Sequence, residues 1–221
     1  MPHARALILF SGTKSVERAL QESQRCTWEC TSLDISPEYA PDLCMSILDF
    51  DQFAYPRGHF ELIHASCPCE GFSIANQGQR NLDLSNSLVL KTLAVLLHLK
   101  PKAWSLENPW TGGLKKQEYM QGWPYRKVHY CSYGMPYLKP TIIFNNLGDH
   151  WTPRPLCRKN CDFCDETGKH ETTAQKGKTR GYPRDTDYKT HQLWVIPHEL
   201  CCEIRDAVEN VVLSGTPPGD E

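Results

Sequence analysis

The sequence predicts an α/β protein in which a doubly wound, mostly parallel sheet carries a small irregular insert near the carboxyl end. Three observations lead to this prediction. Short apolar runs alternate with helical patterns over residues 1–149, as in parallel sheets covered by helices. The candidate reactive residues directly follow apolar runs, at strand ends where ligands bind in such folds. The pattern stops in the polar stretch 150–189 and returns at 190–213.

Each element follows from local composition. The first helix is expected to enter through a Ser15 cap, and the second is closed by Pro101. The last helix begins at Pro197, which suits a first helical turn. The expected strands are residues 6–10, 27–33, 44–48, 61–65, 103–106, 127–131 and 141–144, and the expected helices are 15–24, 87–99 and 197–212.

Composition indicates a soluble globular protein. The chain has 221 residues, a hydrophobic fraction of 40% and a charged fraction of 23%, enough for one domain with a real core. The net charge of −2 gives no overall basic signature, so any phosphate contact must come from a local patch. We expect no membrane span and no secretion signal. The eleven cysteines are therefore expected to be reduced thiols of an intracellular protein, in cytoplasm or nucleus.

The most informative loop follows the apolar run 60–65 and consists of Ser66-Cys67-Pro68-Cys69-Glu70-Gly71-Phe72-Ser73. It presents a thiol at a strand end, and a later apolar segment ends in Glu107-Asn108-Pro109. A thiolate can add to an electron-poor ring while a carboxyl group handles the proton on the ring nitrogen. The alternatives are a buried inert thiol and a turn cap. Cys67 and Cys69 could also chelate a metal or form a redox pair, or Cys67 simply packs in the loop.

A second candidate site is the turn Leu9-Phe10-Ser11-Gly12-Thr13, which lies between a strand and a helix. It could receive a nucleotide-like ligand, or it is a turn that merely needs glycine. Asp34 ends the next strand, where doubly wound folds commonly hydrogen-bond a ribose. The alternative for Asp34 is a helix or turn cap.

The polar insert carries a third constellation, Cys157-x3-Cys161-x2-Cys164-x5-His170. Three thiols and an imidazole have the donor types of a tetrahedral zinc site, and zinc would explain how so polar a segment folds. Free surface thiols are the alternative, and His150 or His191 could replace His170. The basic positions Lys176, Lys178, Arg180, Arg184 and Lys189 predict a flexible loop that tracks phosphates or is merely solvated.

Taken in order, these segments resemble the cytosine-C5 methyltransferase family, most closely its small viral and phage members. The resemblance covers residues 6–145 and 190–212. Cys67–Ser73 is similar to the family's Pro-Pro-Cys-Gln-x-Phe-Ser loop, and Glu107-Asn108-Pro109 resembles its Glu-Asn-Val segment. The further matching segments are Phe10-Ser11-Gly12, Asp34-Ile35, Tyr133-Gly134-Met135-Pro136 with Lys139 and Ile142-Ile143-Phe144, and Val195-Ile196-Pro197 with Leu200 and Ile204.

The chain departs from the family pattern at several positions. Lys14 replaces the second glycine of the cofactor turn, and Ser46 stands where an aspartate would contact adenine, with Asp49 as a possible substitute. The other departures are Cys67 for proline, Glu70 for glutamine, Lys139 and Thr141 for the arginine pair, and Leu193-Trp194 for Gly-Asn.

The resemblance implies a Rossmann-like methyltransferase that moves a methyl group from S-adenosylmethionine to carbon 5 of cytosine in DNA. Cys69 would be the nucleophile and Glu107 would hold the N3 edge, with Lys139 as a third catalytic residue. A duplex base would have to swing out of the stack, with residues 71–85 as a loop that closes over it. The implied cofactor residues are Phe10, Ser11, Gly12, Thr13, Asp34, Ile35, Ser46, Ile47 and Pro68.

The domain prediction follows from these assignments. Residues 1–149 and 190–213 are expected to form the catalytic domain, 150–189 a reduced target-recognition region, and 214–221 a disordered tail. So small an insert predicts a short recognition sequence, because few side chains can reach base edges. RNA or a single-stranded substrate is one alternative, and an inactive adapter that binds cofactor or nucleic acid is another. No oligomeric state is predicted.

Overall fold

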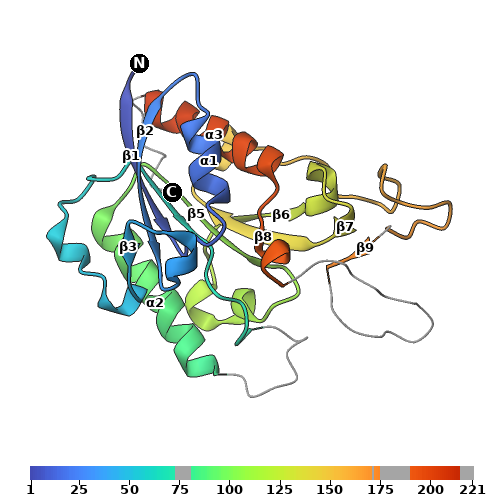
Figure 1. The fold of residues 1–221 in the computed structure, drawn as a ribbon, viewed down its shortest axis with the longest axis horizontal. Coiled ribbons are helices and arrows are strands. Elements are labelled where there is room, and N and C mark those ends of the chain that lie inside the picture. The colour runs from blue at the N-terminus through green and yellow to red at the C-terminus, as the bar shows by residue number, and fades with distance from the viewer. Residues whose placement is uncertain (73–80, 171, 175–189, 215–221) are drawn as a thin grey trace.

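A seven-stranded sheet forms the centre of the molecule (Figure 1), in the order β3-β2-β1-β4-β5-β8-β6. The computed structural model describes residues 1–72, 81–170, 172–174 and 190–214. Strands β1 to β5 run parallel, whereas β8 lies antiparallel between β5 and β6. The predicted α/β, doubly wound, mostly parallel fold is confirmed. The strands are β1 (His3–Leu9), β2 (Thr27–Asp34), β3 (Leu43–Cys44), β4 (Leu62–Ala65), β5 (Ala103–Pro109), β6 (Tyr125–His129) and β8 (Pro140–Asn145), with a separate parallel pair of β7 (Tyr137–Leu138) and β9 (Thr172–Thr173).

Within the described residues, three α-helices cover the two faces of the sheet. Helices α1 (Ser15–Gln21) and α3 (His198–Leu213) lie side by side on one face, and α2 (Leu82–Leu99) lies on the other (Figure 1). Short 3-10 turns make up most connections: η1 (Pro37–Tyr39), η2 (Ile47–Asp49), η3 (Gln52–Ala54), η4 (Leu114–Lys116), η5 (Glu118–Met120), η6 (Tyr130–Tyr133), η7 (Gly148–His150) and η8 (Thr190–Trp194).

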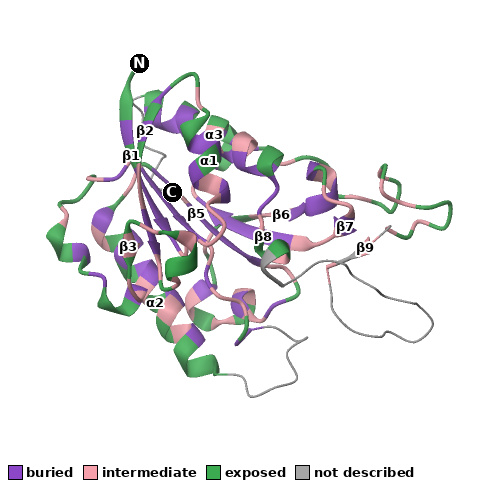
Figure 2. Cartoon of the chain, in the orientation of Figure 1, coloured by how far each residue is buried: buried purple, intermediate pink, exposed green. Residues whose placement is uncertain are grey.

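The sheet separates two hydrophobic cores. Because side chains alternate across a strand, Ala6 and Ile8 of β1 join the core beneath α1 and α3, whereas Leu7 and Leu9 join the core beneath α2. Figure 2 shows the central strands almost entirely buried. Apolar residues on both faces of β1 are what a strand covered by helices on both sides requires.

Helix α2 departs from the sequence expectation about membrane spans. Its 18 residues have a mean hydropathy of 1.3, so by length and composition alone the helix could cross a membrane. The same properties belong to a helix that packs one face against a core, and α2 does so through residues such as Val89, Leu93 and Leu96. Asn81 begins this helix, because its side chain accepts a hydrogen bond of 2.9 Å from the Leu84 amide.

Several predicted elements differ from the observed ones. The helix expected at 87–99 is α2, which already begins at Leu82. The strand expected at 44–48 ends at Cys44, since the Ser46 hydroxyl accepts a hydrogen bond from the Leu48 amide and starts η2. The strand expected at 127–131 is β6, shifted toward the N-terminus. The helix expected at 15–24 ends at Gln21, and Lys14, not Ser15, occupies its cap position. The strand expected at 141–144 is β8, which runs against its neighbours.

The strand order places a crevice at the carboxyl end of the sheet. After β1 the chain turns to one side to form β2, whereas β4 lies on the other side of β1. The loops that follow β1 and β4 therefore diverge, and in open α/β sheets ligands bind at such a reversal. The candidate site lies there.

Candidate active site

A cavity of about 420 Å³ opens at this reversal. Residues from the ends of β1, β2, β4 and β5 line it, together with Lys139 and the segment before α3. The lining includes most residues singled out in the sequence: Phe10, Ser11, Gly12, Thr13, Asp34, Ile35, Pro68, Cys69, Glu107 and Lys139. The two candidate sites of the sequence, the turn after β1 and the thiol loop after β4, thus belong to one cavity.

The Asp34 carboxylate organises one half of this cavity. Its Oδ2 accepts a hydrogen bond of 2.9 Å from the Gly12 amide, and its Oδ1 accepts one of 2.9 Å from the Ser36 amide. These bonds join the turn after β1 to the turn after β2. The Ser11 hydroxyl is buried in the same wall, and its Oγ has no hydrogen-bond partner among the described residues. A buried hydroxyl of this kind is costly to leave unpaired, so it fits a polar ligand in the cavity.

The turn after β1 closes without the second glycine of the family pattern. Lys14 occupies that position with φ 56°, in the left-handed region, and Phe10 and Gly12 also have positive φ values. A side chain in this region costs about 1–2 kcal/mol, whereas glycine adopts it readily. Lys14 therefore takes the conformation of a glycine at an energetic cost, and its ammonium lies 3.5 Å from Glu17.

The thiol loop after β4 is held by contacts to β5 and α2. The Asn108 side chain donates a hydrogen bond of 3.0 Å to the Cys67 carbonyl, and the Gly113 amide donates one of 2.8 Å to the Phe72 carbonyl. Gly71 packs directly on the start of α2, where an added Cβ would lie 2.8 Å from the Ser85 Cβ. No other residue fits there without moving the backbone, so the sequence places a glycine at this point of the loop.

The two thiols of the loop lie in different surroundings. Cys67 is buried against α2, with its Sγ 3.7 Å from the Thr92 hydroxyl, and burial raises the pKa of this thiol to about 12. Cys69 is half-buried, and both thiols belong to the cavity lining. Burial first, and then the Glu107 carboxylate, raise the pKa of the Cys69 thiol, whereas the Lys139 ammonium opposes this rise. Cys69 is therefore the more accessible of the two thiols, since Cys67 is only 3% exposed.

Glu107 lies at the end of β5 with its carboxylate oriented by two neighbours. Its Oε1 accepts a hydrogen bond of 3.0 Å from the Tyr130 hydroxyl and lies 4.0 Å from the Lys139 ammonium. Lys139 also donates a hydrogen bond of 2.9 Å to the Leu193 carbonyl. Glu107 is only 7% exposed, so these partners rather than water satisfy its carboxyl oxygens.

His64 forms part of the cavity floor. Its ring lies between two hydroxyls, with Nδ1 2.8 Å from Ser105 and Nε2 3.1 Å from Ser66. Burial lowers the pKa of His64 to about 4, so the imidazole is neutral near pH 7. Because Ser66 begins the thiol loop, His64 helps to fix where that loop leaves the sheet.

Two predicted cofactor residues lie outside the cavity lining. Ser46 caps η2, and Ile47 is buried in the core beneath α2. Their place is taken by Ser36, Glu38 and Tyr39, which follow β2 and line the cavity without having been predicted.

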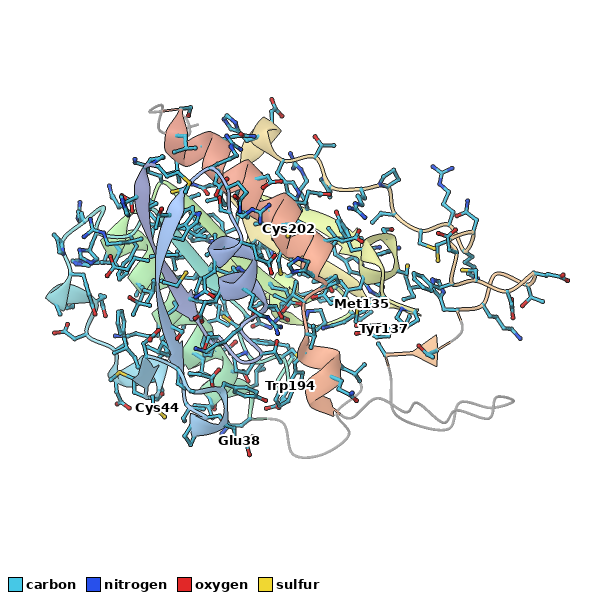
Figure 3. All side chains as sticks on the ribbon, turned by 45° about the horizontal axis from the view of Figure 1, so that its top comes forward. Glu38, Cys44, Met135, Tyr137, Trp194 and Cys202 are labelled. Carbon is cyan, nitrogen blue, oxygen red and sulfur yellow. The ribbon has the colours of Figure 1, made fainter. Side chains whose placement is uncertain are left out.

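The sequence also missed Trp194 and Tyr130. Trp194 lines the cavity and is half exposed, and Figure 3 shows it on the same side of the molecule as Glu38. Trp194 could have been predicted to lie near the cavity, because it directly precedes the Val195-Ile196-Pro197 segment that resembles the family's closing motif. Tyr130 offered no such signal, because its contact with Glu107 joins residues far apart in the chain.

The four predicted metal ligands come together away from the cavity. The His170 Nε2 lies 3.7 Å from Cys157, 3.3 Å from Cys161 and 3.6 Å from Cys164, measured to each Sγ. His150 is in η7 and His191 lies where the structure describes no side chain. Residues 73–80 of the proposed closing loop, the basic loop at 176–189 and the tail at 215–221 lie outside the described residues.

Comparison with known proteins gives one family. The family model described as C-5 cytosine-specific DNA methylase matches residues 40–119. The "Probable DNA (cytosine-5)-methyltransferase" of Frog virus 3 (isolate Goorha) is 33% identical over 159 residues, which are 65% of this chain and 71% of that protein.

Solved structures of similar proteins were also found. One is described as a candidate DNA modification methyltransferase encoded within an E. coli prophage; it is 18% identical, with a TM-score of 0.48 over 64% of this chain and 46% of that chain. The Dnmt2 methyltransferase of S. pombe is 18% identical, with a TM-score of 0.47 over 65% of this chain and 49% of that chain. The chain thus spans about half the length of these solved proteins.

The viral relative matches over most of its length, and the family match includes both the thiol loop and Glu107. On this evidence the chain belongs to the C-5 cytosine-specific DNA methylase family.

Proposed function

We propose that this protein transfers a methyl group from S-adenosylmethionine to carbon 5 of cytosine in DNA, with Cys69 as the nucleophile. One observation carries the proposal. Cys69 and Glu107, from the ends of two adjacent parallel strands, line the same cavity as the Gly12 and Asp34 turns. A nucleophile, an acid and a nucleotide-type pocket are thereby within reach of one substrate base.

Cytosine carbon 5 is a poor nucleophile, and addition of a thiolate at carbon 6 makes it a better one. The Cys69 thiolate forms the bond to carbon 6, and the ring electrons move toward carbon 5. Glu107, held by Tyr130 and Lys139, keeps a proton at the N3 edge and so offsets the negative charge of the adduct. Carbon 5 would then take up the methyl group and lose its proton to solvent, and breaking of the carbon 6–sulfur bond would release the Cys69 thiolate and restore the aromatic ring.

The resting thiol must lose its proton before it attacks. Because burial and Glu107 raise the pKa of the Cys69 thiol, this thiol is protonated at neutral pH. Lys139 is the group that favours the thiolate, and its hydrogen bond to the Leu193 carbonyl keeps its ammonium in place. In this respect Lys139 performs the electrostatic task for which the family pattern has an arginine.

The cavity fits S-adenosylmethionine at the turns after β1 and β2. The sulfonium of this cofactor supplies an electrophilic methyl group. Asp34 and Ser36 lie where a ribose and its neighbours would bind, and Ser11 lines the same space. Tyr39 and Trp194 offer aromatic surfaces for a flat base. Ser46 and Ile47 take no part in this assignment.

DNA that contains 5-fluorocytosine tests the proposal. Fluorine cannot leave as a proton does, so an active enzyme supplied with S-adenosylmethionine stops as a covalent protein–DNA adduct. We expect the wild-type protein and Cys67→Ser to form the adduct and Cys69→Ser to form none. If the adduct instead requires Cys67, the nucleophile is Cys67 and not Cys69. If the adduct forms with RNA and not with DNA, the substrate is RNA. If it forms with neither polymer, the protein is better explained as an inactive adapter that binds cofactor or nucleic acid.

A further inference from the structure

The insert after β8 carries a second group of reactive side chains that methyl transfer does not use. Every residue from 152 to 170 is at least partly exposed to solvent, so this stretch has no hydrophobic core of its own. It nevertheless brings Cys157, Cys161, Cys164 and His170 to one point, within hydrogen-bonding distance of one another in several pairs.

A fifth donor comes from the catalytic domain. Cys131 lies in η6, is only 4% exposed, and faces the insert. The donor atoms of Cys131, Cys157, Cys161 and His170 all lie within 4.8 Å of one another. The sequence spacing gave no hint of Cys131, because β8 and the start of the insert separate it from the other donors.

We propose that Cys131, Cys157, Cys161 and His170 bind one zinc ion that joins the insert to the catalytic domain, and that Cys164 is not a ligand. In a tetrahedral site with Zn–S near 2.3 Å and Zn–N near 2.0 Å, a sulfur and a nitrogen ligand lie about 3.6 Å apart. The His170 Nε2 lies 3.7 Å from the Cys157 sulfur and 3.3 Å from the Cys161 sulfur. These donors need only small movements to enclose the ion.

Contacts between η6 and the start of the insert fix Cys131 relative to its partners. The Ser132 hydroxyl donates a hydrogen bond of 2.9 Å to the Pro155 carbonyl, and Arg154 donates one of 3.1 Å to the Ser132 carbonyl. The Arg154 amide also donates to the Tyr133 hydroxyl at 2.9 Å. The insert thus begins along η6, and the chain that follows folds back so that its thiols reach Cys131.

Cys164 is the competing fourth ligand. Its sulfur lies 3.5 Å from Cys161 and 3.6 Å from the His170 Nε2. Cys164 and His170 are also paired across an isolated bridge of backbone hydrogen bonds, so Cys164 can lie beside the imidazole without any metal. Cys131 has the stronger claim, because it is a buried thiol of the catalytic domain whose sulfur lies within 4.8 Å of the donor atoms of Cys157, Cys161 and His170.

The proposed binding step is balanced in charge and protons. Three thiols lose their protons to solvent as three Zn–S bonds form, and the neutral imidazole of His170 binds through one ring nitrogen. The resulting centre carries one negative charge. No electron is transferred, and each mole of zinc bound releases about three protons.

Thiol labelling of the wild-type protein tests the ligand set without any substitution. The purified protein is expected to hold about one zinc per chain. N-ethylmaleimide followed by peptide mass spectrometry should label Cys164 but not Cys157 and Cys161 in the zinc-loaded protein, and all three after chelation with EDTA. If Cys164 is protected from labelling as well as Cys157 is, the proposed set of four ligands is wrong. If the purified protein contains no zinc and labels identically with and without EDTA, there is no zinc site.

Serine variants give an independent test. Cys131→Ser should weaken zinc binding by more than about 100-fold, since a direct ligand should matter more than a supporting residue, whereas Cys164→Ser should retain it. Cys201→Ser is the matched control, because it also removes a buried thiol from the catalytic domain but lies at α3. Loss of zinc from Cys164→Ser with retention by Cys131→Ser would contradict the proposal.

Discussion

The buried histidine beneath the cavity makes stability depend on pH in a calculable way. His64 is 2% exposed and lies between two serine hydroxyls, and burial lowers its pKa from 6.5 to about 4. Between pH 6.5 and pH 4 the unfolded chain therefore binds a proton at this residue that the folded protein does not. The free energy of unfolding must fall as the pH falls through this window.

The size of the effect follows from the separation of the two pKa values. A separation of about 2.5 pH units at about 1.36 kcal/mol per unit gives about 3 kcal/mol. This stabilisation is fully present above pH 6.5 and is lost by about pH 4. It is large beside the total of about 5–15 kcal/mol that is typical of a folded domain.

Urea unfolding of the wild type and of His64→Asn, measured from pH 4 to pH 7.5, tests the calculation. Burial also lowers the pKa of His129 and His170, so the wild-type pH dependence contains contributions from several histidines. The difference in pH dependence between wild type and His64→Asn isolates the contribution of His64. We expect the pH dependence of His64→Asn to be smaller by about 3 kcal/mol over this range. His3→Asn removes an exposed histidine from β1 and should leave the dependence unchanged. Equal pH dependence in wild type and His64→Asn would show that His64 is not the source of this effect.

Three further predictions concern the turns and the acid of the site. Lys14→Gly should raise the free energy of unfolding by up to about 1 kcal/mol in urea, because it relieves a left-handed side chain; a decrease would show that Lys14 is not strained. Gly71→Ala should lower the free energy of unfolding by at least about 1 kcal/mol and should also lower the rate of methyl transfer, because the added Cβ would meet the first turn of α2. Gly113→Ala, with ordinary contact distances, is the control, and equal losses in both would contradict this account. Tyr130→Phe should lower kcat about tenfold, because it removes a hydrogen bond to Glu107; an unchanged kcat would show that this bond does not act in the rate-limiting step.

The alternation of strands and helices and the positions of the reactive loops could be predicted from the amino-acid sequence. Apolar runs ended just before Asp34, Cys69 and Glu107, and these ends required no knowledge of distant contacts. Parallel strands then bring their carboxyl ends to one edge of the sheet, so local pattern was enough to place the three residues around one cavity.

The residues that complete the cavity and the metal cluster could not be predicted in this way, because they depend on contacts between distant segments. The antiparallel insertion of β8 between β5 and β6, the contact of Tyr130 with Glu107, and the approach of Cys131 to Cys157 all join segments far apart in the chain. A residue's own sequence neighbours carry no information about such pairings. They are set by which strand edges and surfaces remain to be covered once the local elements have formed.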